Sequence, residues 1–299
     1  MAGSFTAFSL SPAPMSDKSN PTIEAFSIIP GHRVLEMEGR DAVKFAQAQF
    51  TTDVATLADD HWHWSGWLTP KGRIIALFAL LRFSAERLWL VLPDADPAGL
   101  AAQLQRFVFR SKVTLRPLAD LVAGGAFTAP ARAAGAAFDQ AGDGTVELDM
   151  GSPEGARTLR LYAGDAVDEP AMAARWAAFD LAHGWPRLDP GQAEQWTPQQ
   201  LSLDRLRAYS VKKGCYPGQE IVARTHFLGK AKRGLVRLRA DGPVSAGDPV
   251  MAGDRELGKV VSAAGGEALA VLPLDLGDAG LALGGAPCAT LPLLDGLAR

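Results

Sequence analysis

Cys215 stands in the segment KKGCYPGQEIVAR, residues 212–224, between two lysines and two glycines. A helix that starts at Gln219 would place the thiol just before its positively polarised end, and Lys212 and Lys213 add positive charge beside it. Both features stabilise a thiolate and so lower the pKa of a cysteine thiol. The segment therefore predicts a nucleophilic or redox-active thiol. The alternative is a small buried cysteine that serves only as an apolar side chain.

The backbone around this cysteine is predicted to be tightly turned. Gly214 and Gly218 allow backbone angles or close approaches that a side chain would block. Pro217 fixes one φ angle between them. Glu220 falls in the first turn of the predicted helix, where the helix dipole favours an acidic side chain. Such a turn presents a side chain in a fixed position, which a purely structural cysteine does not need.

Positive charge gathers on the same stretch of a chain whose formal net charge is −3. Residues 204–239 contain ten Lys or Arg against two Asp or Glu, whereas residues 120–196 contain twelve acidic residues against five Arg. A local positive field attracts anions, so this segment is a candidate anion site. A solvated basic face without a ligand is the alternative.

The segment HWHWSGWLTPKGR, residues 61–73, offers weaker candidates. His61 and His63 share one face of a predicted strand, but no third ligand lies close in sequence, so no metal site is predicted. Trp67 lies on the same face just before a turn and could support a flat ligand. Lys71 begins Lys-Gly-Arg, which is too short for a phosphate-binding loop.

Strands and helices alternate along the region that must position these residues. Their order predicts an α+β layer with helices against a mainly antiparallel sheet. From residue 233 onward, short strands separated by Gly, Pro and Asp predict a small antiparallel barrel or sandwich, with Cys288 as a core residue. The expected strands are 28–38, 61–69, 73–83, 86–92 and 111–117, and the expected helices are 42–50, 96–110, 169–184, 197–209 and 219–224. In the first of these helices, Ala42, Phe45, Ala46 and Gln49 recur at the spacing of one helix face. Asp96 followed by Pro97 predicts an N-cap at the start of the second.

Composition sets further bounds. The chain has 299 residues, which suits two or three domains, and its longest apolar run, 74–81, is too short to cross a bilayer. Two cysteines cannot form a disulfide framework and suggest a reducing compartment. They are also too few to hold a typical iron–sulfur cluster. Residues 1–24 are expected to be a disordered tail without a secretory or Arg-rich mitochondrial presequence, so the cytoplasm is favoured over the mitochondrial matrix.

The signature KKGCYPGQE, with the downstream VAR, resembles the K-G-C-Y-x-G-Q-E motif of the YgfZ-type folate-binding proteins. These proteins are relatives of the glycine-cleavage T-protein, an aminomethyltransferase. Other stretches resemble the family as well and together extend from about residue 25 to 240. They are GRDAVKFAQAQFTTDV, TPKGRIIALFALLR, QRFVFRSKVTL and QWTPQQLSLD.

The resemblance implies a T-protein-like α+β fold of three modules around a central cavity that holds tetrahydrofolate. The expected modules are a first α+β module over residues 25–116, a second over 117–232 that carries the signature, and a C-terminal β-barrel over 233–299. The first two modules can be interleaved in sequence.

The resemblance also implies an accessory factor for the assembly or repair of iron–sulfur proteins, including tRNA-modifying ones. Its expected partners are a reduced folate and iron–sulfur enzymes or assembly proteins, with no membrane, and a monomer is expected. Lys213 and Cys215 become the functional pair. The residues assigned to the folate site are Tyr216, Gln219, Glu220, Arg224, Trp67 and Lys71.

Two other functions stay open at this point. The first is a tetrahydrofolate-dependent, aminomethyltransferase-like one-carbon transferase. No motif here matches the catalytic aspartate of the T-protein, and Glu220 is the only carboxylate in the signature, so whether the protein is an enzyme is left open. The second is an RNA-binding module. Direct tRNA binding is disfavoured because the basic segment has few aromatic residues for base stacking.

Overall fold

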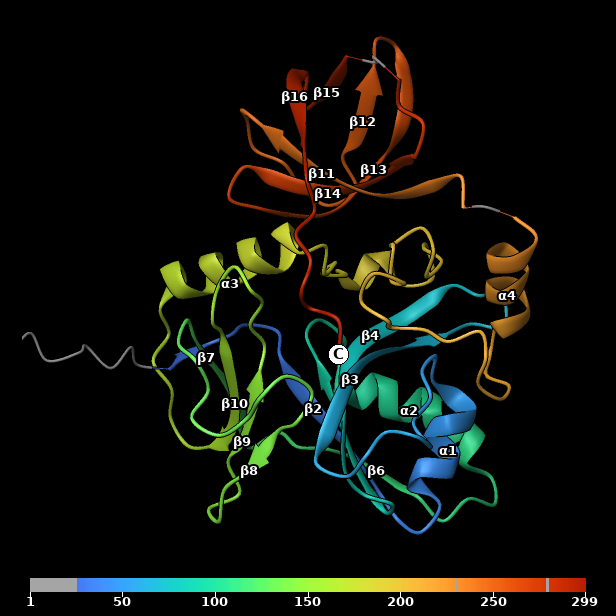
Figure 1. Ribbon diagram of the computed structural model, residues 1–299, viewed down its shortest axis with the longest axis vertical. Coiled ribbons are helices and arrows are strands. Elements are labelled where there is room, and N and C mark those ends of the chain that lie inside the picture. The colour runs from blue at the N-terminus through green and yellow to red at the C-terminus, as the bar shows by residue number, and fades with distance from the viewer. Residues whose placement is uncertain (1–25, 230, 278–279) are drawn as a thin grey trace, which may run out of the picture.

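The structure is a computed structural model that describes residues 26–229, 231–277 and 280–299. The tail expected over residues 1–24 lies outside the described residues. In the described part, the chain forms two five-stranded sheets and a closed six-stranded barrel. The barrel stands above the two sheets, which lie next to each other (Figure 1).

The first sheet has the antiparallel strand order β3-β4-β5-β2-β6. Two helices, α1 (Ala42–Gln49) and α2 (Pro97–Val108), cover one of its faces. The buried residues of α1 are those that the sequence spacing predicted, and Asp96 caps α2 as expected by accepting hydrogen bonds from the amides of Ala98 and Gly99. The strands are β2 (Arg33–Glu38), β3 (His61–Leu68), β4 (Ile74–Ser84), β5 (Arg87–Leu92) and β6 (Thr114–Pro117).

The second sheet has the order β1-β7-β10-β9-β8 and carries the helix α3 (Pro170–Ala182). Its first strand, β1 (Ser27–Ile28), precedes the whole first sheet in sequence and pairs with β7. From residue 26 onward, the chain therefore enters the second sheet first, builds the first sheet, and returns to the second. The remaining strands are β7 (Leu121–Ala126), β8 (Asp139–Gln140), β9 (Val146–Asp149) and β10 (Thr158–Ala163).

The helix expected over residues 197–209 is absent, and this segment is a series of turns. Ser202 and Arg207 adopt positive φ angles of 49° and 55°, which a right-handed helix cannot contain. The buried side chains are Leu201, Leu203, Leu206 and Ala208, and their spacing is not that of one helix face. The sequence predicted a helix for these apolar residues, but in the structure they fill the space between the sheets and the barrel.

The C-terminal region is a closed antiparallel barrel in the order β11-β14-β13-β12-β15-β16, which confirms the predicted α+β architecture with a C-terminal β-barrel. Cys288 is half-buried in β16 and packs against the barrel core. The barrel strands are β11 (Arg233–Ala240), β12 (Pro249–Ala252), β13 (Arg255–Ala264), β14 (Glu267–Pro273), β15 (Leu281–Leu283) and β16 (Ala286–Leu291).

After the barrel, the last residues run back down beside the first sheet (Figure 1). The Leu294 amide donates to the carbonyl of Ala182 at 2.9 Å, and the indole of Trp64 donates to the carbonyl of Leu297 at 2.6 Å. Leu297 is buried in the core between the sheets. This segment therefore ties the barrel to both sheets.

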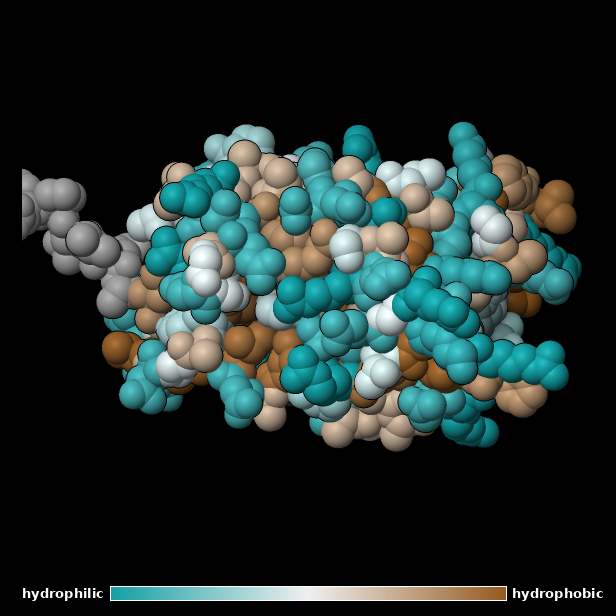
Figure 2. All heavy atoms as spheres, turned by 90° about the horizontal axis from the view of Figure 1, so that it is seen from below, coloured by the Kyte–Doolittle hydropathy of each residue, from teal (hydrophilic) through white to brown (hydrophobic). Residues whose placement is uncertain are grey.

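The largest apolar cluster lies between the two sheets and contains five buried tryptophans, Trp62, Trp64, Trp89, Trp176 and Trp185. Figure 2 shows a face covered mostly by hydrophilic side chains, with hydrophobic residues visible between them, as is normal for a folded protein with internal cores. In the described ranges, no helix is long and apolar enough to cross a membrane.

Candidate functional site

The signature forms a loop followed by helix α4 (Gln219–Phe227), which lies at the end of strands β3 and β4 (Figure 1). Gly218 caps the helix with a φ of 77°. A Cβ atom at this position would lie 2.5 Å from the carbonyl oxygen of Thr69 and 2.7 Å from Cα of Gly72. The loop therefore docks backbone to backbone on the β3–β4 turn, and only glycine fits there.

Gly218→Ala is expected to destabilise the protein by about 1–3 kcal/mol, because it combines a strained φ with a backbone clash. Urea denaturation measures this loss. Gly214→Ala is the matched control, since a Cβ there meets nothing within 4 Å and its φ is not positive, so a change of at most about 0.5 kcal/mol is expected. Equal effects of the two variants would contradict the docked turn.

Lys213 attaches the signature loop to the end of helix α1, which packs on the first sheet. Its buried ammonium donates to the carbonyls of Gln47 and Phe50 at 2.5 Å each and of Thr52 at 3.1 Å. These carbonyls lie at or just beyond the C-terminal end of α1, where the helix dipole favours a cation. A lysine ammonium has three donors, and all three are engaged here. In this structure Lys213 therefore positions the loop, and it has no donor left for the Cys215 thiolate.

The buried charge affects the groups around it. Burial lowers the pKa of Lys213 to about 8, although the carboxylate of Asp53 acts in the opposite direction. Burial and the charge of Lys213 together lower the pKa of His63 to about 4. His63 is therefore neutral near pH 7, with Nε2 2.9 Å from Oγ1 of Thr52. Within the described part of the chain, His, Cys, Asp and Glu form no group of three that could hold a metal ion.

Two further signature side chains hold the turn itself. The buried Tyr216 donates its hydroxyl to the carbonyl of Ser210 at 2.9 Å, and burial raises its pKa. Its ring centroid is 5.0 Å from the ammonium of Lys213. The amide of Gln219 donates to the carbonyl of Lys213 at 3.0 Å. These contacts make both residues positioning residues, and their contact with folate stays a prediction.

Four other predicted site residues are exposed on the two loops that meet at Gly72 and Gly218 or on the helix that follows. Among the described residues, their side chains make no hydrogen bond or ion pair. They comprise one thiol, two cations and one carboxylate, all free to meet a ligand or a partner. These residues are Cys215, Lys71, Arg224 and Glu220.

Trp67 differs from this exposed group, because only 3% of its surface is accessible. It lies on the helix-covered face of the first sheet, where its ring meets Phe107 edge-on at 5.9 Å. Its indole N–H has no hydrogen-bond partner within the described part of the chain. A flat ligand would have to displace Phe107 to stack on it, so this assignment also stays a prediction.

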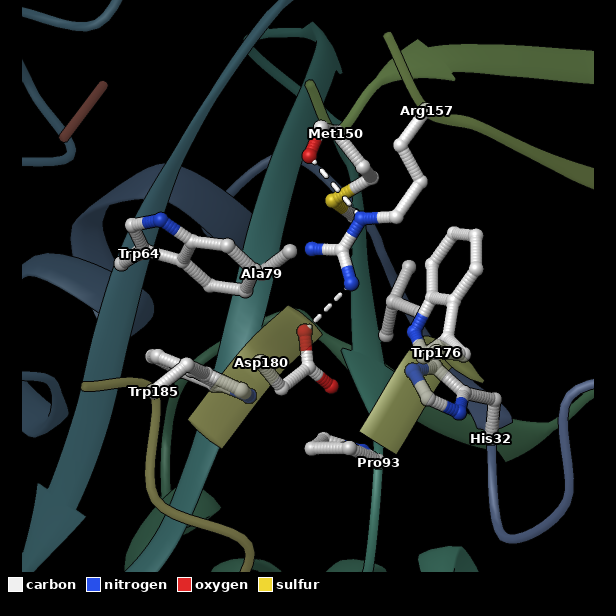
Figure 3. A pocket seen from close by; sticks show the side chains of 10 residues that line it. His32, Trp64, Ala79, Pro93, Met150, Arg157, Trp176, Asp180 and Trp185 are labelled. Carbon is white, nitrogen blue, oxygen red and sulfur yellow. Dashed lines mark hydrogen bonds and ion pairs between the residues drawn. The ribbon is translucent and has the colours of Figure 1, made fainter. Parts of the chain in front are cut away.

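A second candidate site lies between the two sheets and was not found from the sequence (Figure 3). A cavity of about 10 Å³ is lined by the indoles of Trp64, Trp176 and Trp185, together with a buried ion pair. Arg157 donates to Asp180 at 2.6 Å, and both side chains are almost fully buried. Trp176, Asp180 and Trp185 lie close together in sequence, but Trp64 and Arg157 come from distant parts of the chain, so sequence spacing does not show that the five residues meet.

Aromatic rings and carbonyls surround the charges of this cavity. The guanidinium of Arg157 lies 4.1 Å from the ring of Trp176 and 4.2 Å from that of Phe179, and its Nε donates to the carbonyl of Met150 at 3.0 Å. Burial lowers the pKa of Arg157, while Asp180 opposes that shift. Burial, with a smaller contribution from Arg187, also lowers the pKa of His32 well below its usual value, so His32 is neutral.

The chemistry of this cavity suits a pteridine, because flat indoles can stack on the ring and the carboxylate of Asp180 can accept hydrogen bonds from it. Its free volume does not suit a pteridine, since about 10 Å³ holds roughly one water molecule. A folate ring therefore does not enter the cavity in this form. Binding there would require side chains at the seam between the sheets to move.

Comparison with known proteins places these features in a family. The CAF17 C-terminal beta-barrel domain matches residues 232–292. The tRNA-modifying protein YgfZ of Pectobacterium carotovorum is 31% identical over 234 residues, covering 71% of this chain and 70% of that protein. The tRNA-modifying protein YgfZ of Vibrio vulnificus is 28% identical over 269 residues, covering 85% of this chain and 82% of that protein.

A solved structure adds independent support for the fold. The aminomethyltransferase T of the glycine cleavage system from Bartonella henselae superposes with a TM-score of 0.71 over 90% of this chain and 85% of that chain. At 17% identity, this similarity concerns the fold alone. The resemblance first indicated by the KGCYPGQE signature is thus confirmed by relatives that match most of the chain, and the protein belongs to the YgfZ family.

Proposed function

We propose that this protein is a tetrahydrofolate-binding accessory factor for the assembly or repair of iron–sulfur proteins, including those that modify tRNA, with Cys215 as its reactive group. The proposal rests on one observation, the contrast between the exposed thiol of the signature and the fixed backbone around it. The Cys215 thiol is exposed, while the residues on both sides of it are immobilised by Lys213 and Gly218. Two free cysteines fit a protein that works in the reducing cytoplasm.

Each site residue has a stated task under this proposal. Cys215 presents its exposed thiol to an iron–sulfur client, and Lys213 holds the loop that presents it. Lys71 and Arg224, both exposed cations, bind the glutamate carboxylates of the folate. Trp67, Tyr216, Gln219 and Glu220 complete the folate site. Tetrahydrofolate, when bound, supplies a carrier for one-carbon units.

One observation favours a second candidate, an aminomethyltransferase-like one-carbon transferase. Glu220 is exposed and has no hydrogen-bond or ion-pair partner among the described residues, so its carboxylate is available as a general base. Turnover of methylene-tetrahydrofolate with an amine acceptor by the purified protein would discriminate this candidate from an accessory factor.

Cys215→Ser is expected to abolish the function while the fold and the ligand site remain intact. The test is rescue of a bacterial strain that lacks its own YgfZ protein, read as the fraction of thiomethylated tRNA. The variant should restore less than a tenth of the wild-type level, while its stability changes by no more than about 0.5 kcal/mol because the side chain is exposed. Its affinity for reduced folate, measured by calorimetry, should be unchanged.

Cys288→Ser serves as the control, because this half-buried thiol lies in the barrel and should be dispensable for rescue. Full rescue by Cys215→Ser would remove the reactive thiol from the proposal. Absence of any reduced-folate binding by the wild type would remove the folate.

A further inference from the structure

Helix α4 exposes three large apolar side chains immediately after the signature. Ile221 is 41% exposed, Phe227 66% and Leu228, at the C-terminal cap, 84%. Within the helix only Val222 is fully buried, and its carbonyl accepts a hydrogen bond from Gln199 at 2.8 Å, which fixes the inner side. An amphipathic helix normally turns its apolar side inward, whereas α4 buries Val222 and leaves its larger apolar side chains on the outer side.

These exposed residues form one continuous surface. At 3.6 residues per turn, Ile221, Arg224 and Leu228 follow one another at i, i+3 and i+7 on one stripe. Phe227 lies on the adjoining stripe with Glu220, also seven positions apart. We call Glu220, Ile221, Arg224, Phe227 and Leu228 the outer face of α4.

The outer face continues onto the loops that carry the candidate site. A Cβ at Gly72 would lie 3.0 Å from Cβ of Ile221, so the β3–β4 turn with its exposed Lys71 adjoins the helix. Lys212 and Cys215, exposed as well, precede the helix in the signature loop. The exposed apolar side chains of α4 are therefore accompanied by three exposed cations, one carboxylate and a free thiol, on the helix itself, on the adjoining β3–β4 turn or in the loop that leads into the helix.

We propose that the outer face of α4, together with Lys71 and Lys212, docks a folded iron–sulfur protein that presents an apolar patch flanked by carboxylates. This inference rests on the proposed function, because it names the surface that brings a client to Cys215. Charge complementarity selects an acidic client and steers it to this end of the molecule. The exposed aliphatic and aromatic groups supply the central contacts that exclude water.

Other occupants fit the outer face less well. RNA offers phosphates to the cations but no apolar surface for Ile221 and Leu228, and only one aromatic ring on this face could stack a base. An anionic bilayer would repel Glu220, and a helix of nine residues with three apolar side chains inserts too little surface for stable membrane binding. A protein surface satisfies both the charges and the apolar groups.

The test compares Phe227→Asp/Leu228→Asp with Val167→Asp, a matched control that places an acid at an apolar residue 60% exposed and far from α4 in sequence. The probe is a purified, cluster-loaded tRNA-thiomethylating enzyme, and binding is measured by biolayer interferometry at low and high salt. The double variant should bind at least tenfold more weakly and Val167→Asp within twofold of the wild type. Binding should also weaken as salt rises. Reduced-folate affinity and the alkylation rate of Cys215 should stay unchanged in both variants.

The outcomes separate this inference from the function on which it rests. Equal binding by the wild type and the double variant, or no wild-type binding at micromolar concentration, overturns the docking face. Loss of tRNA binding or of self-association in the double variant, with binding to the probe intact, overturns it in favour of RNA or of a second copy of this chain. If Cys215→Ser still rescues the strain but the double variant loses the probe, the docking face stands and the proposed role of the thiol fails.

Discussion

Replacing Asp180 by Ala is expected to destabilise the protein by about 3–5 kcal/mol, the largest stability effect that we predict for a single substitution. The variant leaves the guanidinium of Arg157 without its 2.6 Å partner in a site where the arginine side chain is 1% exposed. An unpaired charge in such surroundings cannot recover its hydration. Urea denaturation monitored by tryptophan fluorescence measures the loss, because Trp176 packs against the same guanidinium.

The double variant Arg157→Met/Asp180→Leu is the matched control for this prediction. Replacing both members of a buried ion pair by apolar groups of similar size is often neutral, so it should cost at least 2 kcal/mol less than Asp180→Ala. If the free energy of unfolding of Asp180→Ala lay within about 1 kcal/mol of the wild-type value, the ion pair would not be shielded from water. Water would then enter the space between the two sheets.

This ion pair also bears on folate binding. It fills the space where three indole rings meet a carboxylate between the two sheets, and the remaining cavity of about 10 Å³ is too small for a pteridine. If a pteridine binds in this cavity, Arg157 must leave Asp180 or the sheets must separate. The exposed cations Lys71 and Arg224 need no such change to bind a glutamate tail.

The sequence predicted the local elements of this fold well where periodicity and capping are strong. Helix α1 has the predicted buried positions, α2 starts at the predicted cap, and α4 follows the predicted turn. The prediction of a helix over residues 197–209 was wrong, because positive φ angles at Ser202 and Arg207 break the helix and the buried side chains there do not follow one helical face. Local sequence patterns do not show which side chains tertiary packing will bury.

The candidate site was predictable in part for the same reason. The signature identified Cys215 and its neighbours, since residue types and spacing alone suggested a constrained thiol. The three carbonyls that hold Lys213 belong to a helix end more than 160 positions earlier in the chain, so the sequence indicated its charge but not its task. The cavity residues are brought together only by the return of the chain to the second sheet.

Replacing Lys213 by Met is expected to destabilise the protein by about 2 kcal/mol at pH 7 and to reduce rescue at least tenfold. Three buried carbonyls lose their donor, at about 1–3 kcal/mol for each group left unsatisfied, and this cost is partly offset because no charge has to be buried. The loop then loses its attachment to α1, so Cys215 is no longer held in one position. Hydrogen exchange at residues 210–216 should become faster in the variant.

Lys212→Met is the matched control, because it removes the same charge from the neighbouring exposed residue and should cost no more than about 0.5 kcal/mol. Two titrations then distinguish the buried ammonium from a surface charge. The pKa of Lys213 is lowered from 10.5 to about 8 in the folded protein, so the unfolded chain binds more protons between these values. The wild type should therefore gain stability over Lys213→Met as pH rises from about 8 to 10.5.

The second titration follows His63 by NMR. Burial and then the charge of Lys213 lower its pKa to about 4, so the pKa should rise in Lys213→Met and stay in place in Lys212→Met. If the two variants behaved equally in stability and in the His63 titration, the ammonium of Lys213 would not be bound by the three backbone carbonyls at the end of α1. Lys213 would then have free donors, and a direct contact with the Cys215 thiolate would replace positioning as its role.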